Sequence, residues 1–437
     1  MTIEMAAQTW RRGQYDEALT KKQKRIIERD VETLFSPAAF LRELTLDELK
    51  LLSPFHPQVE WRGTSVFLSA KAIAALRRLI GLLGDLALLS NSVSPAEIDS
   101  AIRTSYSRWL NKGSKPAGRE FVEEVIQSLI QQIRHYEFLV QVEGLDLKDQ
   151  DILYLGSMRI QQSDKALLEN VDFNGFLDTE KLYSQFKETH WLIGSAKGSV
   201  DIASEQFENQ IVLTIGILAV YSAALNKTAI RSTRVRALTS PPEYRKAVRS
   251  LRWEMGGKNP SLSDAWGLEQ DLPLDSATVL YLTNECFLKQ LSALPDKRNR
   301  SELEDTIVRA VYWFAEAYKD RNLTMQFVKL WSCAECFFSI DQDHITEMNA
   351  KGITAVLTFA GFNVIKPEDY PEFKRQIKKL YQLRSKAIHR AEFGHIEAKV
   401  VDNFSYWVAW VIISMVALTE RGYKTLREVK VEPPRVL

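Results

Sequence analysis

Cysteine is scarce in this sequence, with only Cys286, Cys333 and Cys336 among 437 residues. A small and odd number of cysteines excludes the disulfide framework of a small secreted domain. It is typical of a reducing compartment, so we expect a cytoplasmic protein. Glycine and proline are also few, 19 and 14, which excludes collagen-like and low-complexity chains.

The sequence also lacks a net charge of one sign and a long apolar run. Its 57 Lys and Arg residues balance 56 Asp and Glu residues, so any nucleic-acid binding must depend on local charge. The first residues, MTIEMAAQTWRR, have no apolar core of the kind found in signal peptides, so we expect none. The two longest apolar stretches, 211–225 and 404–419, are shorter than the roughly 20 residues that span a bilayer. We therefore expect core helices and no membrane partner.

The length predicts about three domains at roughly 150 residues each. We divide the chain into a mostly helical region 1–134, to which we assign no role, a mixed α+β region 135–275, and a helical bundle 276–437. The predicted fold class is therefore mainly α, with an α+β region before the bundle.

Strand patterns are confined to the first two regions. Residues 59–68 predict a short hairpin, and residues 136–145, 152–160 and 190–195 predict strands because they are apolar, β-branched and short. The stretch that contains Pro241, Pro242, Gly256, Gly257 and Pro260 is interpreted as loop.

The last region has the apolar spacing of a helical bundle. The predicted helices are 276–294, 302–319, 323–340, 344–359, 371–390 and 398–421. The last of them is apolar on both sides, so it lies either at the centre of the bundle or in a subunit interface.

The helix 371–390 carries an arginine where an apolar residue is expected. At 100° per residue Arg384 lies in the middle of an apolar stripe. Arginine keeps its charge, so it needs a buried acid or an anion in a cleft, and Glu335 is the expected carboxylate. Such a pair could serve a reaction or only tie two helices together. His389, five residues on, lies near the expected end of the helix, where the helix dipole favours imidazolium.

Two segments are basic within this neutral chain. Residues 374–390 contain seven Lys and Arg residues and no acid, and residues 227–258 contain nine against two acids, with Tyr244 and Trp253 interleaved. Both could bind a polyanion such as RNA, and both could equally be solvated surface.

A family resemblance appears at this point. The string LYQLRSKAIH at 380–389, together with LWSCAECFFS at 330–339, resembles the Apea-like branch of the HEPN superfamily. The resemblance covers roughly residues 276–421 and extends more weakly back to about 136. Ser385 follows the arginine, as is common in that branch, and Arg390 stands where the family often has glycine.

The resemblance implies a dimeric helical bundle that cleaves RNA without a metal or other cofactor. It implies a toxin or anti-phage defence effector, with tRNA among the expected targets. It assigns the reaction to Arg384 and His389, with Ser385 beside them and Glu335 as the holding carboxylate. We expect Lys386, Arg390, Arg245, Arg249 and Arg252 to bind RNA, and a trigger or antitoxin protein as a further partner. The alternative is a non-catalytic RNA-binding or protein-interaction module.

Other motifs in the sequence give less support for a functional site. Cys333 and Cys336 form a CxxC inside an apolar helix with no second pair, which favours buried side chains over a metal site. The glycines near 194–199 and 256–258 lack the outer glycine of a phosphate-binding loop. No triad is visible around the remaining histidines, which are His56, His135, His190, His344 and His395. Of these, His395 is close enough to His389 in the sequence to be worth mutating.

Overall fold

The computed structural model describes residues 14–41, 57–169, 178–187, 189–225, 235–237, 248–254, 258–265, 271–320, 322–339, 344–390 and 396–431. Within these ranges some side chains are not described, among them those of His389 and Arg390. The chain is mainly helical with small sheets, which confirms the predicted fold class.

The chain divides into two compact units. One comprises Met1–Glu137 and Ser195–Phe207, and the other comprises Phe138–Gly194 and Glu208–Leu437. The division at residue 137 lies close to the predicted boundary at 134. The predicted regions 135–275 and 276–437 fall mostly in one unit, and the boundary at 275 stays a prediction.

The first unit is built from helices around one apolar core. Its main elements are α2 (Gln14–Ala18), α3 (Lys21–Leu34), α5 (Ala70–Gly84), α6 (Pro95–Lys112), α7 (Gly118–Ile130), β1 (Gln58–Trp61) and β2 (Thr64–Phe67). The predicted hairpin at 59–68 is confirmed, and its turn residues Arg62 and Gly63 have the positive φ that a two-residue turn favours. Glu28 accepts bonds from the N–H groups of Gly118 and Arg119, 2.9 and 3.2 Å away, and so caps α7.

A five-stranded sheet follows in the chain. Its order is β5 (Ile152–Leu155), β6 (Met158–Gln162), β7 (His190–Gly198), β3 (Arg134–Glu143) and β8 (Arg236–Ala237). The single strand predicted at 152–160 is wrong, because the chain turns at Gly156, whose φ is 62°. The carboxylate of Asp296 fixes this turn by accepting bonds from the N–H and hydroxyl of Ser157 at 2.7 and 2.8 Å.

The predicted loop around Pro260 is also corrected. Strands β9 (Val248–Glu254) and β10 (Lys258–Ala265) pair antiparallel there, and the register shifts between Lys258 and Ser261, beside the proline that cannot donate to the ladder. Arg249 and Arg252 lie on β9, but their side chains are not described, and Arg245 lies outside the described residues. Their expected contact with RNA stays a prediction.

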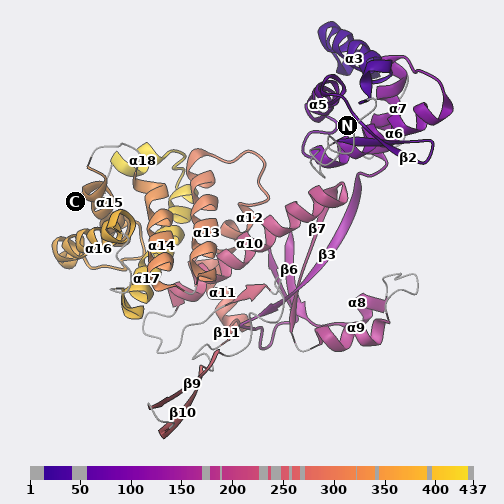
Figure 1. Ribbon diagram of the computed structural model, residues 1–437. Coiled ribbons are helices and arrows are strands. Elements are labelled where there is room, and N and C mark those ends of the chain that lie inside the picture. The colour runs from indigo at the N-terminus through magenta and orange to yellow at the C-terminus, as the bar shows by residue number, and fades with distance from the viewer. Residues whose placement is uncertain are drawn as a thin grey trace. The chain divides into compact units, whose positions relative to one another are not determined.

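The C-terminal bundle follows the predicted helices closely (Figure 1). It contains α11 (Ser276–Glu285), α12 (Leu288–Ala293), α13 (Glu302–Lys319), α14 (Leu323–Phe338), α15 (Ile345–Phe359), α16 (Tyr370–Arg390), α17 (Ala398–Glu420) and α18 (Leu426–Val431). The helix predicted at 276–294 is split at Phe287, which has a φ of 60°. Helix α17 contacts α12, α13, α14 and α15, and most of its apolar residues are buried within the chain, while Tyr406, Trp407 and Trp410 are half-buried. Of the two places expected for this helix, it occupies the centre of the bundle.

Two described helices, α10 (Val200–Leu225) and α17, are long and apolar enough to cross a membrane. The length argument from the sequence was wrong, because polar turns extend both helices beyond their apolar stretches. In each helix, however, 67% of the most apolar window is buried inside the protein. Such burial is typical of core helices, so the length and apolar composition of α10 and α17 do not indicate that they cross a membrane.

Helix α10 packs against α13 at a glycine. A Cβ built on Gly216 would lie 2.8 Å from the carbonyl oxygen of Val311 and 3.0 Å from the Cβ of Ala315. Because the first of these atoms is backbone, the two helices would have to separate to accept a larger residue.

We therefore expect Gly216→Ala to lower the free energy of unfolding by about 1–3 kcal/mol, the usual cost of overpacking. The matched control is Gly81→Ala on α5, where a Cβ would meet no atom within 4 Å. It should stabilise by up to about 1 kcal/mol through helix propensity alone. Chemical denaturation measures both, and equal effects of the two substitutions would contradict the close packing of α10 on α13.

Candidate functional site

Helix α16 presents an apolar stripe to the bundle. Phe373, Ile377, Leu380 and Ala387 are buried, as the sequence predicts. Ile388 departs from the predicted stripe, because it is 43% exposed. The buried stripe therefore extends to Ala387 and does not include Ile388.

Arg384 forms an ion pair with Glu335 of α14. Its Nη2 donates to the Glu335 Oε2 at 2.9 Å, and both side chains are only 17% exposed. The expected pairing of these two residues is confirmed. The guanidinium cannot be neutralised by deprotonation, so its burial in the stripe has a desolvation cost. The Glu335 carboxylate offsets this cost.

Tyr381 joins this pair from the preceding turn of α16. The Arg384 Cζ lies 5.5 Å from the centre of the Tyr381 ring, within cation–π range. Burial raises the pKa of Tyr381, and the neighbouring Glu335 carboxylate raises it further, so the phenol stays neutral. The same ring meets Trp331 edge-on with centroids 5.0 Å apart. Sequence reasoning assigned Tyr381 only to the apolar stripe, although its position three residues before Arg384 puts both on one face.

The guanidinium of Arg384 keeps hydrogen-bonding capacity. Its Nε is buried and has no hydrogen-bond partner among the described residues. Arginine has five N–H donors in a fixed fork, and an anion that reached this nitrogen would satisfy it.

A groove of about 500 Å³ lies beside this cluster. It is lined by His344, Ile345, Thr346, Glu347, Lys378 and Tyr381, from the start of α15 and the middle of α16. The carboxylate of Glu347 contacts both Lys374 and Lys378. Hydrogen bonds from these two lysines lower the pKa of Glu347 to about 2, so it is charged at neutral pH.

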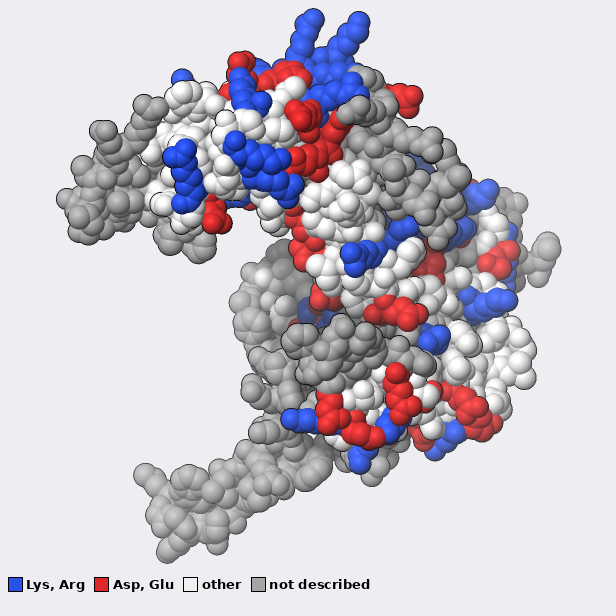
Figure 2. Space-filling view, turned by 90° about the vertical axis from the view of Figure 1, so that its right-hand side faces the viewer, with Lys and Arg blue, Asp and Glu red and all other residues white. Residues whose placement is uncertain are grey.

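These ion pairs reduce the basic character predicted for residues 374–390. Lys374 and Lys378 share Glu347, Arg375 lies 2.5 Å from Glu372, and Arg384 is paired with Glu335. Lys379 and Lys386 are exposed and form no ion pair within the described part of the chain. An RNA interface on α16 would therefore depend on a few cations rather than on a broad positive field. Figure 2 shows a different face of the molecule from the one that carries α16, and basic and acidic side chains are interspersed on that face too.

The other predicted site residues of the bundle lie on the last two turns of α16. Ser385 is half-buried beside Arg384, and Lys386 is exposed. His389 and Arg390 form the end of α16, but their side chains are not described. The structure therefore brings Arg384 and Glu335 together and adds Tyr381, while the place of the His389 imidazole stays a prediction.

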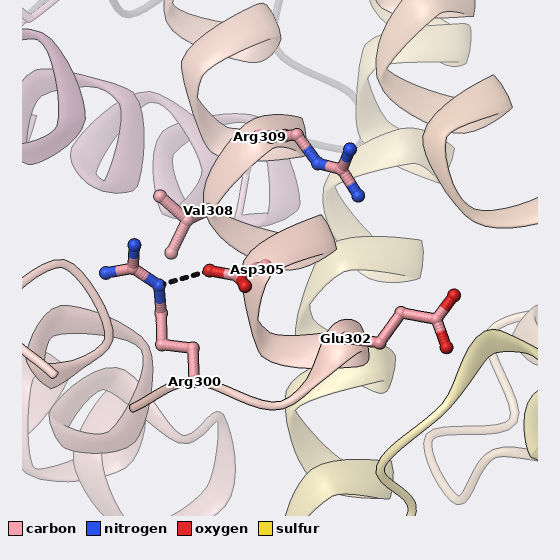
Figure 3. A pocket seen from close by; sticks show the side chains of 5 residues that line it. All are labelled: Arg300, Glu302, Asp305, Val308 and Arg309. Atoms are coloured by element: carbon pink, nitrogen blue, oxygen red, sulfur yellow. Dashed lines mark hydrogen bonds and ion pairs between the residues drawn. The ribbon is translucent and has the colours of Figure 1, made fainter. Parts of the chain in front are cut away.

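A second hollow, of about 510 Å³, lies at the start of α13 (Figure 3) and is lined by Arg300, Glu302, Asp305, Val308 and Arg309. The guanidinium of Arg300 already forms hydrogen bonds within the protein. The Nε donates to Asp305 at 2.6 Å, and Nη1 donates to three backbone carbonyls, those of residues 294, 295 and 297. These bonds fix the loop before α13, so this arginine is structural.

The two cysteines of α14 are largely buried, with Cys333 buried and Cys336 half-buried. Cys333 donates to the Ala310 carbonyl at 3.1 Å, and burial raises the pKa of both Cys333 and Cys336. Among the described residues, no group of three or more His, Cys, Asp or Glu side chains could hold a metal ion. Metal independence of any reaction stays a prediction.

Comparison of the chain with protein-family models, with curated proteins and with solved structures gives no match. The HEPN resemblance therefore depends only on the sequence strings at 330–339 and 380–389.

Removing the charge of Glu335 tests the ion pair. We expect Glu335→Gln to lower the free energy of unfolding by about 2 kcal/mol, because a hydrogen bond to a charged group contributes about 1.5–3 kcal/mol. The matched control is Glu372→Gln, whose pair with Arg375 is 65% and 69% exposed. That change should cost about 0.5 kcal/mol or less. Urea denaturation measures both, and a Glu335→Gln protein as stable as the wild type would rule out a structural ion pair.

Proposed function

We propose that the C-terminal bundle is a metal-independent endoribonuclease of the HEPN type. Arg384 and His389 act at its reaction centre, with Ser385 beside them and Glu335 holding the arginine. The observation that supports the proposal most is the Arg384–Glu335 pair at 2.9 Å, on the two helices that carry the family-like strings.

The chemistry fits these residue types. Cleaving RNA through its own 2′-OH requires a base for that proton, an acid for the 5′-oxygen leaving group and a fixed cation for the charge on phosphorus. Arg384 can supply the cation, because Glu335 orients its guanidinium and Nε still lacks a partner among the described residues. His389 can exchange protons near neutral pH.

A two-fold dimer would bring two copies of His389 to one cleft. Helix α17 gives little support for such an interface, since most of its apolar residues are buried within the chain. Ile388 does, because it is a large apolar residue, 43% exposed, next to His389 at the end of α16. An interface there would set two α16 ends against each other.

RNA recognition is assigned to Lys386, Arg390 and the basic segment with Arg245, Arg249 and Arg252. Each can contact phosphate without reading sequence. The protein would act in the cytoplasm as a toxin or defence effector on RNA such as tRNA, under the control of a trigger or antitoxin protein.

Cleavage in the absence of free metal tests the proposal. Purified protein incubated with total RNA in EDTA should cut it. Arg384→Ala should reduce the rate by roughly 10²–10³-fold, as loss of a charge-stabilising donor does. His389→Ala should reduce it by roughly 10²–10⁴-fold, as loss of an acid–base group does.

The control is Arg375→Ala on the same helix, an exposed arginine that should leave cleavage unchanged. If wild type, Arg384→Ala and His389→Ala all bind RNA in a shift assay and none cuts it, the non-catalytic RNA-binding module is the better account. Equal cutting by all three would indicate a contaminating nuclease and contradict the assignment.

A further inference from the structure

Among the described residues, Glu335 holds the Arg384 guanidinium through one hydrogen bond. The Arg384 Nη2 donates to the Glu335 Oε2 at 2.9 Å, which fixes one end of the group. One such contact leaves the guanidinium plane free to turn about it, so the carboxylate alone does not set the direction of the remaining N–H donors. A cation that stabilises charge on phosphorus needs a second contact, because its donors must be in place before the reaction.

Tyr381 supplies a contact of a different kind. Its ring centre lies 5.5 Å from the Arg384 Cζ, within the range in which an aromatic ring attracts a guanidinium. The two residues are three apart on α16, so they lie on one side of that helix. The hydrogen bond to Glu335 and the ring of Tyr381 together restrict both the position and the tilt of the guanidinium.

The ring of Tyr381 is itself held by the core of the bundle. It meets Trp331 edge-on, with centroids 5.0 Å apart and an angle of 88° between the planes, and Trp331 is fully buried. Trp331 lies one turn before Glu335 on α14. The two groups that contact Arg384 are therefore both held by the same turn of α14.

The hydroxyl group of Tyr381 has no protons to exchange near neutral pH. Burial raises the pKa of Tyr381, and the charge of Glu335 and a hydrogen bond to it raise this pKa further. A phenol that stays protonated cannot act as a base, and it is a poor acid. What Tyr381 offers a reaction at this site is the placement of Arg384.

We propose that Tyr381 is a positioning residue for Arg384, whose aromatic ring holds the guanidinium at the tilt that binds a phosphate oxygen during RNA cleavage. The inference rests on the proposed function, and it deepens it by adding to the reaction centre a residue that acts only through Arg384. The ring carries this role, and the hydroxyl adds to it only through Glu335.

Two substitutions separate the ring from the hydroxyl. Tyr381→Phe keeps the ring and should retain the cleavage rate within about 3-fold, because one hydrogen bond to Glu335 is lost and the cation–π contact is kept. Tyr381→Leu removes the ring and should lower kcat roughly 10-fold, the loss expected for a partly buried cation–π contact. Its pH profile should keep the wild-type shape, since the phenol exchanges no proton.

A double-mutant cycle distinguishes positioning from a general loss of structure. Tyr381→Leu added to Arg384→Ala should cause no further loss of cleavage, because the guanidinium through which the ring acts is already absent. A ring that only packs the bundle would lower the rate again in the double variant.

The matched control is Tyr370→Leu at the start of α16. The ring of Tyr370 is also half-buried, and it packs on Phe359 with centroids 5.8 Å apart. This variant should cleave like the wild type, and urea denaturation shows that each variant is folded.

The outcomes separate the two proposals. If the wild type cleaves and Tyr381→Leu matches it, the role of Tyr381 is overturned and the endoribonuclease stands. Equal losses in Tyr381→Phe and Tyr381→Leu would assign the effect to the hydroxyl and overturn the role of the ring, as would a further loss in the double variant. A wild type that cuts no RNA overturns the proposed function, and the role of Tyr381 with it.

Discussion

The permanent charge of Arg384 is the constraint on which the candidate site depends. A guanidinium in the apolar stripe of α16 must be paired, and Glu335 of α14 pairs it at 2.9 Å. That bond links two helices of the bundle. Tyr381, which lies against Arg384, also lines the groove at the start of α15.

The aromatic core beneath the pair keeps it rigid. Tyr381 lies against Arg384 and meets Trp331 edge-on, and Trp331 packs on Phe404 of α17 with centroids 4.5 Å apart. Helix α17 lies at the centre of the bundle, so this chain of contacts connects the mostly buried Arg384 to the core of the fold. Preorganised charge of this kind is what stabilises a phosphorane, because it needs no rearrangement during the reaction.

Local signals made the bundle predictable. Helix α13 begins at its capping box, Ser301 with Glu304, and its predicted bounds match the structure. The spacing on α14 and α16 also identified Glu335 as the partner of Arg384. The hairpin of β5 and β6 was not predictable in this way, because its two-residue turn at Gly156 is set by Asp296, far along the chain.

The groove was beyond sequence reasoning for a similar reason. His344 shows no motif, and it reaches Tyr381 only because α15 packs antiparallel to α16. The basic run at 374–390 was visible, but its neutralisation by Glu347 depends on the same packing. Periodicity determines the helices, and these were predictable. Among the contacts between distant helices, the pair of Arg384 with Glu335 was predictable because a buried arginine needs an acid, whereas the contacts of Glu347 with Lys374 and Lys378 were not.

The most direct test of the account is the chemistry of the RNA ends. If the 2′-oxygen attacks phosphorus as we propose, with Arg384 stabilising the charge, the first products are those of transesterification. Mass spectrometry of a defined oligonucleotide cut by the wild-type protein should therefore find 2′,3′-cyclic phosphate and 5′-hydroxyl ends. Ends with 3′-hydroxyl and 5′-phosphate would require a different nucleophile and would contradict the account.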